Sequence, residues 1–107
     1  MNVEYIMDSL ASRTISNRSI VWHESEMNLD GSVTWEYNPF KENETEYLPH
    51  IRNYELCRLT YNKQDGTYTF FYRTVFHQVY DNSFEVEETF PLCNYHATNL
   101  HQAIVRK

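Results

Sequence analysis

Only two glycines occur among the 107 residues, and each follows an aspartate, in Asp30-Gly31 and Asp65-Gly66. An Asp-Gly pair between two runs of apolar and β-branched residues is a strong short-range signal of a β-hairpin. We therefore expect two hairpins, with the chain reversing at each glycine. Because both glycines are then committed to turns, the chain has no glycine-rich loop of the kind that lets a backbone approach a phosphate.

The first hairpin is expected to pair residues 20–29 with residues 32–38. A three-residue turn at residues 30–32 places Val33 opposite Leu29 and Trp35 opposite Met27. A two-residue turn would instead place these apolar side chains opposite polar ones. The three-residue turn keeps each face of the hairpin consistent and is the register that we predict.

The second hairpin is expected to pair residues 54–62 with residues 67–79 through a two-residue turn at Asp65-Gly66. This register places Leu59 opposite Tyr72 and puts large apolar groups on both faces of the hairpin.

A further turn at residues 81–82 adds a fifth strand at residues 83–90. It places Val86 opposite His77, with Phe84 and Phe90 on the same face as Val86. Glu85, Glu87 and Thr89 are expected to point the other way.

Helical spacing appears at both ends of the chain. Near the N-terminus the residues that share one stripe of a helix are Val3, Ile6, Met7, Leu10 and Ala11. In the tail, residues 94–107, the corresponding residues are His96, Leu100, Ala103 and Ile104. The tail favours a helix, although residues 103–105 also suit an edge strand.

These elements predict an α+β fold in a single domain, residues 1–107. It consists of an N-terminal helix, an antiparallel sheet of about five strands in two hairpins and a meander, and a short C-terminal helix. Since both faces of the central hairpin carry large apolar groups, we expect something to cover each face. The terminal helices can cover one of them.

No apolar run reaches the ~20 residues that a membrane-spanning helix needs, so no membrane contact is expected. The first ten residues carry two acids and no base, unlike a leader peptide. The two cysteines do not form a disulfide framework, which favours a reducing, cytoplasmic setting.

The net charge of −6 is unevenly distributed along the chain. Seven acids and one base fall between Glu24 and Glu46. The chain has no cluster of lysines and arginines, so direct binding to nucleic acid is not expected. An acidic surface attracts basic ones, although such a run is commonly only a solvated face.

Residues that could carry chemistry do not converge in the sequence. Cys57 lies in the middle of a predicted strand, where a buried and inert thiol is expected. Cys93, His96 and His101 have a spacing that could contribute to a zinc site, but a fourth ligand is missing from the pattern. We predict no catalytic residue, no metal and no cofactor.

The leading hypothesis is a small acidic, non-enzymatic protein-protein interaction module that binds a larger basic protein. Asparagine and tyrosine, which have AT-rich codons, are abundant, with ten and nine residues. This composition suits a phage or mobile-element inhibitor of a nucleic-acid-handling host or defence protein, acting in the host cytoplasm. The predicted partner-binding residues are Glu24, Glu26, Asp30, Glu36, Tyr37, Phe40, Glu42, Glu44, Glu46 and Tyr47.

The alternative is a small-molecule binding module with an aromatic-lined pocket on a curved sheet. Its predicted lining is Leu59, Tyr61, Phe70, Tyr72 and His77. An enzyme using His77 in such a pocket is the least favoured hypothesis. A homodimer that forms through an exposed sheet edge stays open at this point.

Overall fold

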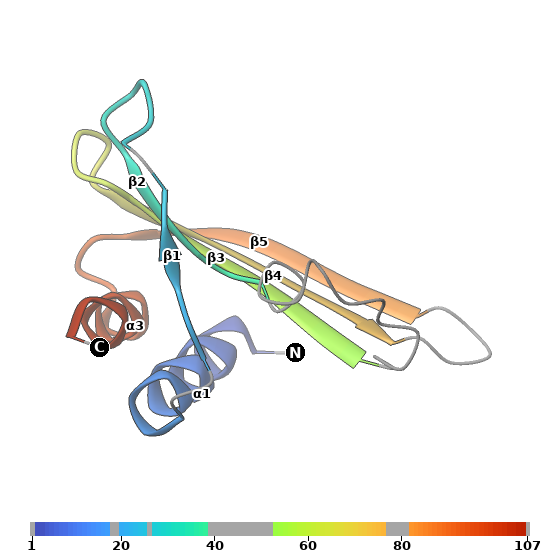
Figure 1. The fold of residues 1–107 in the computed structure, drawn as a ribbon. Helices are drawn as coiled ribbons and strands as arrows, with labels where there is room; N and C mark the ends of the chain where they lie inside the picture. The colour runs from blue at the N-terminus through green and yellow to red at the C-terminus, as the bar shows by residue number, and fades with distance from the viewer. Residues whose placement is uncertain (1, 18–19, 26, 39–52, 77–81, 107) are drawn as a thin grey trace.

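The computed structural model describes residues 2–17, 20–25, 27–38, 53–76 and 82–106. Its helices and strands are α1 (Val3–Ser16), β1 (His23–Glu24), β2 (Val33–Tyr37), β3 (Asn53–Asn62), β4 (Thr67–Phe76), β5 (Asn82–Pro91) and α3 (Tyr95–Arg106). The strands form one antiparallel sheet in the order β1-β2-β3-β4-β5. Both helices lie on the same side of this sheet and pack against each other (Figure 1). The predicted α+β fold is confirmed.

Both helices form where the sequence spacing predicts them. The side chain of Asn2 caps α1 by accepting hydrogen bonds from the backbone N–H groups of Glu4 and Tyr5, at 2.9 and 3.2 Å. The predicted stripe of α1 is buried from Ile6 to Ala11. In α3 the buried residues are Ala97, Leu100, Ala103 and Ile104, so the alternative of an edge strand at residues 103–105 is wrong.

The core lies between the helices and one face of the sheet. Cys57, Leu59 and Phe70 are fully buried on this face, and Trp35, Tyr68 and Phe90 are nearly so. Alternate residues of each strand point to the same side, which places Tyr72, Phe84 and other half-buried aromatic residues around the same core. We call this the helix-covered face.

The predicted register of the second hairpin is wrong by two residues. Leu59 pairs with Phe70 rather than with Tyr72, and the turn has four residues, 63–66. The Asn62 side chain accepts a hydrogen bond from the backbone N–H of Asp65 at 3.0 Å, which closes the wider turn. Gly66 lies at the end of this turn with φ +69°, a conformation that suits glycine. Because side chains alternate with period two, the shift leaves every residue on its predicted face.

The predicted pairing of β5 is also wrong. Val86 pairs with Tyr72 rather than with His77, and Glu85 pairs with Arg73. This register places an acid opposite a base and keeps Val86 beside the core aromatic residues. His77 and most of the predicted turn lie outside the described residues. The predicted bounds of the strand, residues 83–90, are within one residue of those of β5.

The first hairpin differs most from prediction. Its first strand has only two residues, and Trp35 pairs with Glu24 instead of Met27. A polar contact favours this pairing, because the indole Nε1 of Trp35 donates a hydrogen bond to Glu24 Oε1 at 3.1 Å. The loop is closed by Asp30, whose carboxylate accepts hydrogen bonds from the backbone N–H and hydroxyl of Ser32. These bonds hold Ser32 buried and lower the pKa of Asp30.

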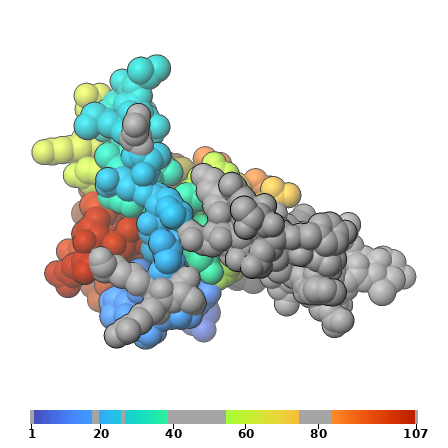
Figure 2. All heavy atoms as spheres, viewed as in Figure 1, coloured from blue at the N-terminus to red at the C-terminus, as the bar shows by residue number. Residues whose placement is uncertain are grey.

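Met27 and Leu29 are left exposed in this loop. The loop lies beside the β3–β4 turn, and both tips project beyond the helices (Figure 2). Within the described residues, no helix is long and apolar enough to cross a membrane.

Candidate functional site

The face of the sheet turned away from the helices carries polar rows. Thr34, Thr60, Thr69 and Thr89 occupy one line of paired positions from β2 to β5. The hydroxyls of Thr34 and Thr60 lie 2.9 Å apart, and those of Thr69 and Thr89 lie 3.3 Å apart. No second layer of described residues lies over this face (Figure 1), so we call it the open face.

The next row of the open face combines charge with an aromatic ring. The Arg58 guanidinium lies over the ring of Phe71, with 4.4 Å between its Cζ atom and the ring centroid. The same guanidinium pairs with Glu36 at 3.7 Å. Arg58 therefore shields the apolar ring that led us to expect a covering layer. In the following row, Arg73 Nε is buried without a hydrogen-bond partner.

The acids of β5 have a different environment from those of the first hairpin. Glu85, Glu87 and Glu88 are all exposed, and β5 contains no base. Among the described residues, none of these three carboxylates takes part in an ion pair or hydrogen bond. These exposed carboxylates therefore gather at the last strand of the sheet order, where Arg73 of β4 lies opposite Glu85.

The predicted partner-binding residues divide into two groups. Glu24, Asp30 and Glu36 are engaged by Trp35, Ser32 and Arg58, as described above. Tyr37 is half-buried, with its ring centroid 6.0 Å from that of Trp22. The other predicted residues lie outside the described ranges: Glu26, Phe40, Glu42, Glu44, Glu46 and Tyr47. Glu85, Glu87 and Glu88 are not among the predicted partner-binding residues, although the sequence shows that no base lies beside them along the strand.

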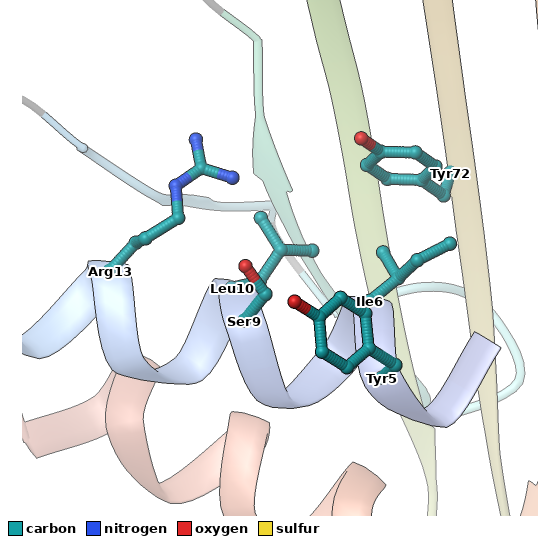
Figure 3. A pocket seen from close by; sticks show the side chains of 6 residues that line it. All are labelled: Tyr5, Ile6, Ser9, Leu10, Arg13 and Tyr72. Carbon is teal, nitrogen blue, oxygen red and sulfur yellow. The ribbon is translucent and has the colours of Figure 1, made fainter. Parts of the chain in front are cut away.

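A pocket of about 250 Å³ lies between α1 and β4. Its lining is mostly apolar and consists of Tyr5, Ile6, Ser9, Leu10, Arg13 and Tyr72, which Figure 3 shows around the space between the helix and the strand. The Arg13 guanidinium and the Tyr72 hydroxyl supply its polar end. This volume is at the lower end of what binds a small organic molecule.

The polar end of the pocket is a three-residue network on the helix-covered face. Arg13 Nη2 donates to one oxygen of Glu55, and the Tyr72 hydroxyl donates to the other at 2.9 Å. The hydrogen bond to Glu55 raises the pKa of Arg13, and burial raises the pKa of Tyr72 well above its usual range. Arg13 therefore stays a cation and Tyr72 a neutral donor, and both groups donate to the same side chain, Glu55.

Of the predicted pocket residues that the structure describes, only Tyr72 lines this cavity. Leu59 and Phe70 are fully buried in the core, where neighbouring side chains fill the space around them. Tyr61 packs against Tyr68 and the ring of His101. His77 lies outside the described residues. The lining from α1 was not predicted, since nothing in the sequence links residues 5–13 to residue 72.

The two cysteines and the half-buried His101 have different surroundings. Cys57 is fully buried, and burial raises the pKa of its thiol well above the usual range. His101 Nδ1 lies 2.6 Å from the Tyr68 hydroxyl, and burial lowers the pKa of this histidine. Cys93 is exposed, and its thiol is free. His101 and His96 contact different residues, so the structure gives them separate structural roles.

His96 ties the N-terminal halves of the two helices together. Its Nδ1 lies 2.8 Å from Asp8 Oδ1, and its Nε2 lies 2.9 Å from Glu4 Oε2. Each ring nitrogen faces a carboxylate, so both must donate and the imidazole must be protonated to make both bonds. The hydrogen bond to Asp8 accordingly raises the pKa of His96.

This arrangement predicts a pH-dependent contribution to stability. Because the pKa of His96 is higher in the folded chain, its stabilisation is complete below the unfolded value of about 6.5 and is lost as pH rises through the folded value. We expect the unfolding free energy of the native chain to exceed that of the His96→Gln variant at about pH 5.5, with a smaller difference at about pH 8.5. Urea titrations at the two pH values measure it. His101 is present in both proteins, so its own titration cancels in the comparison. A difference in unfolding free energy that is the same at both pH values would contradict the prediction.

No protein family model matches this chain, and comparisons with curated proteins and with solved structures give no significant match.

Proposed function

We propose that this chain is a small acidic, non-enzymatic interaction module that binds a larger basic protein. The observation that carries the proposal is the row of exposed glutamates on β5, which form no ion pair among the described residues, next to a sheet face that no described layer covers. Clustered carboxylates raise the association rate with a basic surface and favour it over acidic ones. Cys57, His96 and His101 are held in structural contacts, whereas the glutamates of β5 are exposed and can meet a partner.

The basic partner is proposed to be a nucleic-acid-handling protein of a host or a defence system, which this chain inhibits. Such proteins expose clustered lysines and arginines that neutralise phosphates. A chain with net charge −6 can occupy the same surface and compete with the nucleic acid. The abundance of asparagine and tyrosine supports a phage or mobile-element origin, with action in the host cytoplasm.

Charge reversal in the segment 42–46 tests this proposal. We expect the triple variant Glu42→Lys, Glu44→Lys and Glu46→Lys to capture several-fold less of the partner from host lysate than the native chain does. Quantitative mass spectrometry of the captured protein measures the change. The triple variant to glutamine at the same sites, which removes charge without reversing it, should give an intermediate value.

The same capture experiment is repeated at raised salt and with added nucleic acid. Capture by the native chain should weaken as salt is raised, because the contact is electrostatic. Added nucleic acid should compete for the captured protein. Capture that neither salt, nucleic acid nor charge reversal changes would show that the acids serve only to keep the chain solvated.

The pocket beside α1 favours a second candidate, the binding of a small molecule. Its walls suit an apolar body, and the free donors of Arg13 and the Ser9 hydroxyl suit an acceptor group. A ligand that raises the melting temperature of the native chain but not that of a pocket-filling Ser9→Trp variant would select this candidate. The small volume and the prior engagement of Arg13 by Glu55 make it the weaker one.

A further inference from the structure

The outer edge of β5 is a long unpaired strand edge. β5 is the last strand of the sheet, and each of its ten residues pairs in unbroken register with β4. Within the described ranges, no residue pairs with its other side. Such an edge presents backbone N–H and C=O groups that can bind another strand. It lacks a bulge, and its proline lies only at the final position.

The side chains of β5 select which strand this edge can accept. Two copies joined through β5 would bring six glutamates onto one pair of strands, and like charges on facing strands are destabilising. The glutamates therefore disfavour self-association while leaving the backbone free. A strand with basic side chains meets opposite charges instead, and each such pair contributes about 0.2–1 kcal/mol.

The two faces of the edge also differ. Glu85 and Glu87 lie on the open face, whereas the helix-covered face carries the half-buried Phe84 and Val86 and the exposed Glu88. An added strand continues the same alternation, so its side chains on the open face would meet carboxylates, and those on the other face would meet apolar groups with one carboxylate beside them. The best complement is an extended segment that alternates basic with apolar or β-branched residues.

We propose that the outer edge of β5 binds an extended basic segment of the partner protein as a sixth strand of the sheet. This inference rests on the proposed function, because it assumes a basic partner, and it adds the place and the mode of binding. Affinity comes from main-chain hydrogen bonds along the edge, and specificity comes from the alternation of basic and apolar side chains.

Three synthetic peptides of equal length separate strand addition from simple charge attraction. The peptide KVKTKVKTKV has the proposed pattern. The peptide KPKTKPKTKP has the same charge, but its prolines prevent it from forming a strand ladder. The peptide EVETEVETEV can form a strand but has the opposite charge. Fluorescence anisotropy at about 50 mM salt measures their binding to the full chain.

We expect the first peptide to bind at least about tenfold more tightly than either of the other two. Hydrogen exchange on the native chain should show new protection of β5 amides and little change in α1 and α3. This second measurement needs no variant and stays informative if a variant fails to fold.

A pair of double variants locates the contact. Glu85→Lys with Glu87→Lys should weaken binding of the first peptide at least about tenfold, because two attractive pairs become repulsive. Glu4→Lys with Asp65→Lys changes the net charge by the same amount, on α1 and in the β3–β4 turn, and should change the affinity less than about twofold. Circular dichroism checks that both variants fold.

Each alternative outcome overturns the inference in a recognisable way. Equal binding of the two lysine peptides would show attraction by charge alone, which rejects strand addition and leaves the proposed function intact. Failure of all three peptides, together with capture of the partner that still depends on charge and salt, would reject only the β5 site. A dimer in sedimentation equilibrium that Glu85→Gln with Glu87→Gln strengthens, because the like charges are removed, would show that a second copy occupies the edge.

Discussion

Replacing Phe70 by alanine is expected to lower the unfolding free energy by about 3–5 kcal/mol, the largest effect of any single substitution considered for this chain. Phe70 is fully buried on the helix-covered face, and its ring stacks on that of Tyr72 with centroids 6.2 Å apart. Truncation removes buried apolar surface and leaves a cavity between the sheet and the helices. Natural domains have a total stability of about 5–15 kcal/mol, so this loss approaches the whole margin.

Urea unfolding measures the effect as a fall in the midpoint with an unchanged slope. Since Phe70→Ala can leave too little native protein to titrate, Phe70→Leu provides a milder test and should cost about 1–2 kcal/mol. The matched control is Phe71→Ala, one residue further along β4. Phe71 is half-buried on the open face beneath Arg58, so its loss should cost clearly less. Equal losses at positions 70 and 71 would mean that the open face is covered as completely as the other.

Phe70 and Phe71, which lie on opposite faces of the sheet, illustrate which part of the fold the sequence predicts. The alternation of apolar and polar residues assigns Leu59, Phe70 and Tyr72 to one face correctly, because period two is a local property of each strand. The register between strands depends on turn geometry, and here polar bonds decide it. Asn62 widens the second turn, and Asp30 with Ser32 shortens the first hairpin. No apolar pattern contains that information.

The candidate site also combines features that the sequence predicts with features that depend on how the elements pack. The acidic character and the absence of a basic cluster could be predicted from composition alone. The engagement of Glu24 by the Trp35 indole could not, because it depends on a register that the apolar pattern misassigns. The pocket joins residues 5–13 to Tyr72, and this contact exists only after α1 docks on the sheet. Conversely, β5 stands out as the last strand of the sheet only once the strand order is known.

The second large effect is expected at Glu55, where one carboxylate holds two elements together. Replacing Glu55 by alanine should lower the unfolding free energy by about 2 kcal/mol, because the Arg13 guanidinium and the Tyr72 hydroxyl both lose their acceptor. The side chain of Glu55 is only 18% exposed, which limits how well water can replace it. The Arg13 side chain is 42% exposed, and solvent screening there keeps the loss below that of a fully buried pair.

Two further variants separate charge from hydrogen bonding at this position. Glu55→Gln keeps an acceptor for Tyr72 but removes the charge that faces Arg13, so it should cost about half as much as Glu55→Ala. Glu36→Gln breaks the longer ion pair with Arg58 on the open face, and such exposed pairs contribute less than about 1 kcal/mol. Urea titrations of the three variants at neutral pH rank them. If Glu55→Ala cost as little as Glu36→Gln is expected to cost, α1 would not depend on this carboxylate for its attachment to the sheet, and the stabilising contacts would lie in the apolar stripe alone.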